Sequence, residues 1–196
     1  MQTVEAVALG LFEERGFGTV TVEEIALEAQ ISTRTFYRYF PAKDDVLQVL
    51  IERRSEALRA TLEARPHDEP PLHSLRRALE SVLAAEDPVA VRRWINVVYA
   101  TPGVLKAVVG GIQLNSQRVI AEFFGSRLEL PGDALVPTML AAAAGGVIMA
   151  AHTQWFFLGG ELAATVSESL DVLETGFGAN PAIWDQRGAP GALGDW

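Results

Sequence analysis

The chain has 196 residues, of which 49% are hydrophobic and 21% charged, and its formal net charge is −9. This composition excludes a disordered or low-complexity chain and allows one large domain or two small ones. The absence of cysteine excludes disulfide scaffolds, thiolate zinc sites and thiol catalysis. Because only three scattered histidines are present, we expect no bound metal and no cofactor. So acidic a chain does not bind nucleic acid over its whole surface, but it can carry one small basic face.

The N-terminus has neither the basic nor the apolar segment of a secretory signal, so we expect a cytoplasmic protein. Residues 134–160 carry no formal charge and are long enough to span a bilayer. They contain Pro137, His152 and Gln154, however, and they lack flanking Lys or Arg. We therefore expect no membrane span here, but a helix buried on most sides in a core or a subunit interface.

Apolar residues recur at helical spacing along almost the whole chain, which predicts an all-α protein. The expected helices cover residues 3–15, 22–29, 33–39, 43–64, 72–85, 88–100, 104–126, 133–158 and 161–177. Breaks are expected at Thr101-Pro102-Gly103 and at Gly159-Gly160, and residues 178–196 are expected to form an irregular tail.

The first three expected helices carry clear end signals. Glu24 follows Thr21 at the spacing of a capping box, and Ser32 is placed to cap the third helix. Gly16 suits the end of the first helix, and Phe40-Pro41 ends the third. The buried face of the first helix is expected to consist of Val4, Ala8, Leu11 and Phe12.

Two short helices joined by a tight turn, after a longer first helix, have the layout of a helix-turn-helix. The two helices cross closely, so the first must offer a small residue at the contact, and Ala26 does so. The wedge between them is expected to be filled by Ile25, Ala29, Ile31 and Phe36.

The second of these helices lies in a basic segment. Residues 31–43 contain Arg34, Arg38 and Lys43 and no acidic residue, so their charge is +3 and that of the rest is −12. A short helix of this size and chemistry fits the major groove of DNA. The alternative is a solvated basic helix face whose tyrosines belong to the core.

The same residues carry a resemblance to a known family. The pattern is Thr21-Val22-x-x-Ile25-Ala26-x-x-Ala29-x-Ile31-Ser32-x-x-Thr35-Phe36-Tyr37-x-Tyr39-Phe40-x-x-Lys43-x-x-Val46-Leu47, preceded by Leu11-Phe12-x-x-Arg15-Gly16-Phe17. It resembles the DNA-binding domain of TetR-family transcriptional regulators and covers about the first quarter of the chain. The remainder is similar to that family only in its layout of helices.

The resemblance implies a homodimeric, ligand-responsive repressor that binds a palindromic double-stranded DNA operator and is released by a small-molecule effector. It implies base contacts from Thr33, Arg34, Thr35 and Arg38. It implies phosphate contacts from Thr21, Tyr37, Tyr39 and Lys43. The expected domains are a helix-turn-helix domain over 1–46, a helical effector-binding and dimerisation domain over 47–177, and the tail over 178–196.

The sequence departs from the family pattern at two places. Gln30 stands where the family usually has glycine, and a left-handed backbone costs about 1 kcal/mol more for Gln than for Gly. Family members usually carry a basic arm before the first helix, whereas this chain begins almost inside that helix. We therefore expect its DNA affinity to be weaker than that of a version extended by such an arm.

The last two long helices carry the features expected of a dimer interface. The small residues of 141–146 and 150–151 allow helices to approach closely. The last helix has an apolar stripe that would be exposed on a monomer, and we expect a symmetric homodimer to bury it. The stripe consists of Leu162, Val166, Leu170 and Leu173. The alternative is that it packs within one subunit.

The effector is expected to be small and apolar or amphipathic, because the middle helices carry few charges. Aromatic or polar residues on these helices are the candidates for its pocket, and a core position is the alternative for each. The candidates are Trp94, Tyr99, Asn115, Met139, Met149, His152 and Trp155.

Enzyme signatures are not evident in the sequence. It shows no Gly-rich phosphate loop with a lysine, no serine elbow and no His-Glu metal spacing, so we expect no catalytic activity. The alternatives are a helical interaction or scaffold protein with a non-functional reading head and, less favoured, a helical enzyme.

Overall fold

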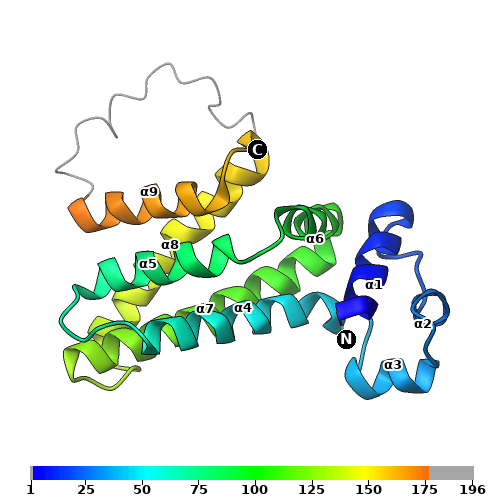
Figure 1. Cartoon of the computed structure of the whole chain (residues 1–196), viewed down its shortest axis with the longest axis horizontal. Helices are drawn as coiled ribbons and strands as arrows, with labels where there is room; N and C mark the ends of the chain where they lie inside the picture. Colours follow the sequence, from blue (N-terminus) through cyan, green and yellow to red (C-terminus); the bar gives the residue numbers. More distant parts are fainter. Residues whose placement is uncertain (1, 177–196) are drawn as a thin grey trace. The chain divides into compact units, whose positions relative to one another are not determined.

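The computed structural model describes residues 2–176, and their side chains except those of residues 2, 3, 50, 107–109 and 111–114. Within this part the regular structure is entirely α-helical, which confirms the predicted fold class (Figure 1). The helices are α1 (Gln2–Arg15), α2 (Val22–Glu28), α3 (Thr33–Tyr39), α4 (Asp45–Glu63), α5 (Pro71–Ala84), α6 (Pro88–Ala100), α7 (Pro102–Leu128), α8 (Leu135–Leu158) and α9 (Leu162–Thr175). The expected irregular tail, 178–196, lies outside the described residues.

The chain forms two compact units. Unit 1 comprises Met1–Ala57 and Glu86–Ser116, and unit 2 comprises Leu58–Ala85 and Gln117–Trp196. α4 and α7 therefore each contribute residues to both units. The expected functional boundary between residues 46 and 47 stays a prediction.

Most helix ends lie where the local signals place them. α3 and α6 have the expected bounds, and α1 ends at Arg15, directly before Gly16, whose φ is +84°. The expected break at Thr101-Pro102-Gly103 is confirmed only at Thr101. Pro102 and Gly103 were wrongly placed in it, because α7 begins at Pro102. Proline fits the first turn of a helix, where its missing N–H would have no partner in any case.

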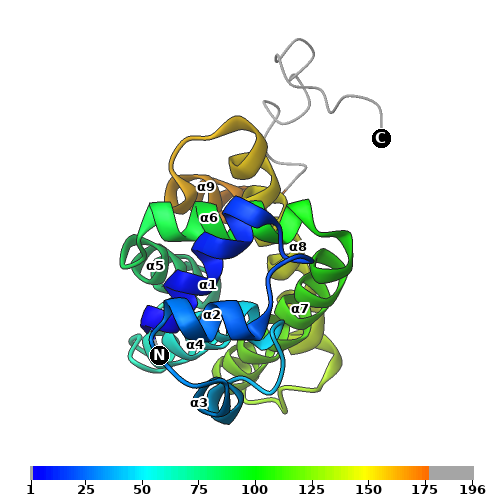
Figure 2. The same cartoon turned by 90° about the vertical axis from the view of Figure 1, so that its right-hand side faces the viewer.

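The core of unit 1 includes the predicted face of α1. α1 packs against α2 and α6, and α2 packs against α3 (Figure 2). Ala26 is buried, and Ile25 and Phe36 are completely enclosed. Ala29 and Ile31 were also expected to fill the wedge, but they are only half-buried. Both lie beside the turn after α2, at the edge of the contact.

In unit 2, α9 packs against both α5 and α8. Leu162, Val166 and Leu170 are buried there, with exposed fractions of 9%, 1% and 0%. These three residues belong to the core of the subunit, so their expected place in a dimer interface is wrong. A stripe at helical spacing marks a buried face, but it does not say whether the same chain or another covers it.

The outward face of α8 is apolar. Among the described residues α8 is the one helix long and apolar enough to cross a membrane, with a mean hydropathy of 1.6 over a stretch that is 22% buried. This is weak evidence for a span, because core helices pass the same test. The core of unit 2 buries only one face of α8, so the helix is not buried on most sides by the core of this chain. Its burial in a subunit interface stays a prediction. The exposed large residues of α8 are Leu135, Val136, Met139, Leu140, Phe157 and Leu158.

Leu170→Ala tests the position of α9 in the core. The substitution should lower the free energy of unfolding by about 2–5 kcal/mol, because it leaves a cavity at a fully buried site. Denaturant unfolding at a fixed protein concentration measures this loss. Glu168→Ala, at an exposed position of the same helix, is the control and should change stability by less than about 0.5 kcal/mol. Similar losses for the two variants would contradict this packing.

Candidate nucleic-acid interface

The N-terminus of α2 is fixed by the predicted capping box. The Thr21 hydroxyl oxygen accepts a hydrogen bond from the backbone N–H of Glu24 at 3.2 Å. The Glu24 carboxylate in turn accepts from the backbone N–H of Thr21 at 2.8 Å and from its hydroxyl at 3.1 Å. The backbone bond and then the hydroxyl bond hold the pKa of Glu24 below its usual value.

The turn between α2 and α3 has the left-handed residue that the sequence predicts. Gln30 has φ +56°, and its N–H donates to the Leu27 carbonyl at 3.1 Å. The N–H of Ile31 donates to the carbonyl of Ala26 at 2.9 Å. This long backward bond is typical of a Schellman turn, which requires a left-handed residue just past the helix. The turn therefore sets the direction in which α3 leaves α2.

α3 is held at its start and at its centre. The Ser32 hydroxyl accepts from the backbone N–H of Thr35 at 3.0 Å and so caps the helix. Phe36 is 0% exposed, and its ring centroid lies 5.2 Å from that of Phe40. With Phe36 directed inward, the opposite side of this short helix faces solvent.

The predicted base-contacting residues share this short helix. Arg34 and Arg38 are exposed, whereas Thr33 and Thr35 are half-buried. Arg38 donates to the Tyr39 hydroxyl at 3.0 Å, and its guanidinium carbon lies 4.7 Å from the Tyr39 ring centroid. The structure thus brings the four residues together and leaves both guanidinium groups at the surface.

The predicted phosphate-contacting residues are not all equally available. Tyr37 and Tyr39 are 51% and 49% exposed. Thr21 uses its hydroxyl in the cap of α2. Lys43 directs its ammonium group at the carbonyls of Phe17 and Val20, at 2.6 and 2.8 Å. Contacts from these four residues to phosphate stay predictions.

The predicted effector residues fall into two groups. Trp94, Tyr99 and Asn115 belong to unit 1. Trp94 is buried, and its indole N–H donates to the Leu47 carbonyl at 3.0 Å, which fits the core alternative.

The other four, Met139, Met149, His152 and Trp155, belong to unit 2. Trp155 is buried and donates to the carbonyl of Gly160 at 2.9 Å. The His152 Nδ1 lies 2.8 Å from the carbonyl oxygen of Ile148, and Met139 is 59% exposed. The structure does not bring the seven residues together within one unit, and their role in a pocket stays a prediction.

Unit 2 contains a cavity of about 180 Å³ that none of the seven residues lines. Its apolar surface comes from Leu62, Val119 and Phe123, which are all buried. The cavity is lined by Arg59, Leu62, Glu63, His67, Val119, Glu122, Phe123, Ser126 and Arg127. Residues from the end of α4 and from α7 meet here, and no motif in the sequence signals their meeting.

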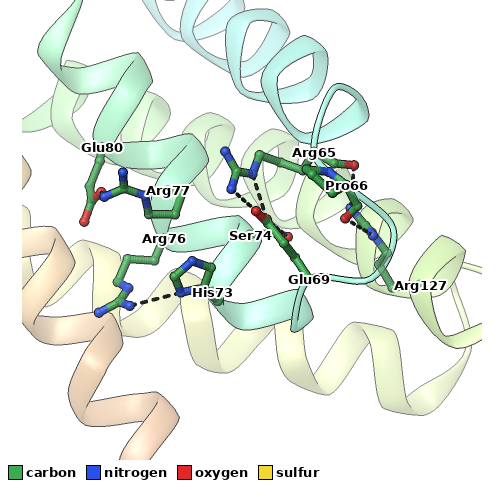
Figure 3. A network of polar contacts seen from close by, with 9 residues as sticks. All are labelled: Arg65, Pro66, Glu69, His73, Ser74, Arg76, Arg77, Glu80 and Arg127. Carbon is green, nitrogen blue, oxygen red and sulfur yellow. Dashed lines mark hydrogen bonds and ion pairs between the residues drawn. The ribbon is translucent and has the colours of Figure 1, made fainter.

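A polar network holds the loop beside this cavity (Figure 3). Arg127 donates to the carbonyls of Pro66 and Arg65, at 2.6 and 3.0 Å. The carboxylate of Glu69 accepts from Arg65 at 2.8 Å and from Ser74 at 2.7 Å. These bonds, with that from Arg65 first, hold the pKa of Glu69 below its usual value.

These features define a helix-turn-helix protein with a larger helical C-terminal part. Residues 6–50 match the family model for bacterial regulatory proteins of the tetR family, and residues 69–178 match the model for the MftR C-terminal domain. The second match alone covers more than half of the chain. The chain belongs to the TetR family of bacterial regulatory proteins.

Individual relatives match the chain over only part of its length. The HTH-type transcriptional regulator TcmR of Streptomyces glaucescens is 35% identical over 106 residues, which are 50% of this chain and 47% of that protein. The match therefore spans about half the length of this relative.

Two solved structures are similar to the chain over most of its length. A TetR-family regulator from Syntrophomonas wolfei has a TM-score of 0.67 at 18% identity, over 89% of this chain and 94% of that one. The repressor FadR of Thermus thermophilus, in complex with lauroyl-CoA, has a TM-score of 0.58 at 21% identity, over 89% and 93%. At these identities the likeness shows the fold alone.

Glu24→Gln tests the capping box through its pH dependence. A folded-state pKa below the unfolded value stabilises the fold above the unfolded pKa, and this contribution is lost as the pH falls through the folded pKa. The wild type should therefore lose its advantage over Glu24→Gln between about pH 5 and pH 3. Thermal unfolding across this range measures the difference, with Glu28→Gln at the other end of α2 as control. Parallel pH profiles for wild type and Glu24→Gln would count against the capping role.

Proposed function

We propose that the chain is a transcriptional regulator that reads double-stranded DNA with α3. The observation that carries this proposal is the exposure of Arg34 and Arg38 on a short helix within an acid-free segment. A basic side chain can donate two hydrogen bonds to guanine in the major groove, and the threonine methyl can contact thymine. Thr33 and Thr35 lie on the same helix and complete the proposed reading surface.

Phosphate contacts would orient this surface on the duplex. Tyr37 and Tyr39 are half exposed at the end of α3, and a phenol hydroxyl can donate to a phosphate oxygen. Thr21 lies at the N-terminus of α2, where backbone N–H groups favour an anion. Such contacts position the protein without reading sequence.

We further propose that the chain acts as a homodimer through the outward face of α8. This face combines large apolar residues near both ends with small residues between them, and it has no formal charge. Ala143, Gly146 and Ala150 are exposed there and would let a second copy approach closely. A two-fold dimer would present two copies of α3, which must lie about 34–36 Å apart to read successive major grooves on a palindromic operator.

The regulator would be a cytoplasmic, non-catalytic repressor released by a small effector. FadR of Thermus thermophilus, which shares the fold, is a repressor with lauroyl-CoA bound, and this supports a ligand-responsive role. A ligand that prefers a state with wrongly spaced copies of α3 lowers DNA affinity by its differential affinity for that state.

The cavity in unit 2 is a second candidate for the effector site, beside the residues named from the sequence. Its apolar floor and charged rim suit an amphipathic molecule. At about 180 Å³ it lies below the roughly 300–1,000 Å³ of typical ligand pockets. The effector that fits it without rearrangement is therefore a small one.

Selection of bound sequences from a random duplex pool tests the proposed function. We expect a palindromic sequence, because the two copies of α3 would be related by two-fold symmetry. Arg34→Ala should weaken binding to the selected duplex by about 1–3 kcal/mol with little change in thermal stability. Arg118→Ala, at an exposed position on α7, is the matched control. Failure to enrich any sequence, or equal losses for both variants, would refute DNA reading by α3.

Ala143→Arg tests the proposed dimer. An arginine in the centre of the outward face of α8 should prevent close approach of a second copy and leave its charge unpaired at the contact. Light scattering at micromolar concentration should give twice the 21.2 kDa chain mass for wild type and the single mass for Ala143→Arg. Ala60→Arg, at an exposed position on α4, should remain dimeric. A monomeric wild type would contradict the proposal.

A further inference from the structure

Lys43 lies between α3 and α4, and its ammonium group turns back to the loop between α1 and α2. It donates to the carbonyl oxygens of Phe17 at 2.6 Å and of Val20 at 2.8 Å. It also lies 4.3 Å from the centroid of the Phe17 ring, within the range of a cation–π contact. One side chain thus joins segments that are 23 and 26 residues apart in the sequence.

The loop that Lys43 holds leads directly into α2. It begins at Gly16, and the Phe17 ring centroid lies 4.9 Å from that of Phe12 on α1. Val20, just before the Thr21 cap, is 2% exposed. The position of the α2 N-terminus therefore depends on how this loop is held.

The segment between α3 and α4 that carries Lys43 is also held in place. Phe40 is buried at the C-terminus of α3, and the Ala42 N–H donates to the Asp45 carboxylate at 2.6 Å. Burial of Phe36 and Phe40 attaches α3 to the core, but apolar contact is not directional. Hydrogen bonds from a charged donor have a preferred geometry and are stronger than neutral ones. Lys43 therefore supplies a directional contact between the end of α3 and the start of α2.

We propose that Lys43 is a positioning residue of the DNA-reading surface and not a phosphate ligand. Two of its three N–H donors and the ring contact are already used within the chain, in a part-buried site. A phosphate contact by these donors would require their release from the loop. Lys43 acts by fixing the position of the capped α2 N-terminus relative to α3, so that both contact the duplex at the same time. This inference rests on the proposed DNA-reading function.

Lys43→Met tests the proposal, because methionine keeps an apolar stem of similar length and removes the ammonium group. The chain has one other lysine, Lys106, which is exposed on α7, so Lys106→Met is a matched control for the loss of charge. Lys43→Arg keeps the charge and offers donors to the same carbonyls. The first measurement is amide hydrogen exchange of residues 17–22 in the full chain without DNA. Faster exchange in Lys43→Met, with Lys43→Arg near wild type and Lys106→Met unchanged, supports a positioning role.

The second measurement is the salt dependence of affinity for the duplex selected from the random pool and for a random-sequence duplex. Lys43→Met should bind the selected duplex about tenfold more weakly and the random one almost as well as wild type does, and Lys43→Arg should recover most of the loss. The slope of log affinity against log salt concentration should stay that of wild type, whereas loss of one phosphate contact lowers it by about 0.9. This comparison also separates positioning from simple loss of folding, which would weaken binding to both duplexes alike.

The outcomes separate the alternatives. Unchanged exchange of residues 17–22 in Lys43→Met, or a slope reduced by about 0.9, would overturn the positioning role. A wild type that binds neither duplex would refute the proposed function, while the exchange measurement would still decide whether Lys43 holds the loop.

Discussion

The surface of α3 depends on the burial of one aromatic ring. A helix of seven residues is far too short to be stable by itself, so packing must hold it. Phe36 at its centre is 0% exposed and provides that packing, while Ser32 satisfies a backbone donor at its start. With this ring inside, Arg34 and Arg38 are left on the outer side. The core contact and the exposed basic surface are thus two consequences of the same short helix.

The charge distribution of the chain favours contact with DNA at the exposed surface of α3. The whole chain carries −9, yet residues 31–43 carry +3 and contain no acid. An acidic body repels a polyanion at long range, so productive contact is confined to the segment where the charge is reversed. The contact between Arg38 and Tyr39 and the turn at Gln30 then restrict how that segment is presented.

Local features of the fold were predictable from the sequence because neighbouring residues determine them. The Thr21–Glu24 box and the left-handed Gln30 depend on spacings of a few residues, and both are confirmed. The same holds for the start of α3, which Ser32 caps.

Features that depend on distant segments were not predictable. The sequence places Leu170 on an apolar stripe, but only the fold shows that α9 packs against α5 and α8 of the same chain and that Leu170 is buried. The sequence suggests Lys43 only as a phosphate contact, whereas the fold brings the carbonyls of Phe17 and Val20 to its ammonium group. The cavity beside Arg127 arises between α4 and α7, which no local pattern connects.

The most direct test of the central claim is hydrogen exchange of the full chain with and without the selected duplex. If α3 enters the DNA groove, the amides of residues 31–43 and of the α2 N-terminus become protected when the duplex is added, and most of unit 2 changes little. Protection confined to other segments, with the exchange of residues 31–43 unaffected by a bound duplex, would contradict the account.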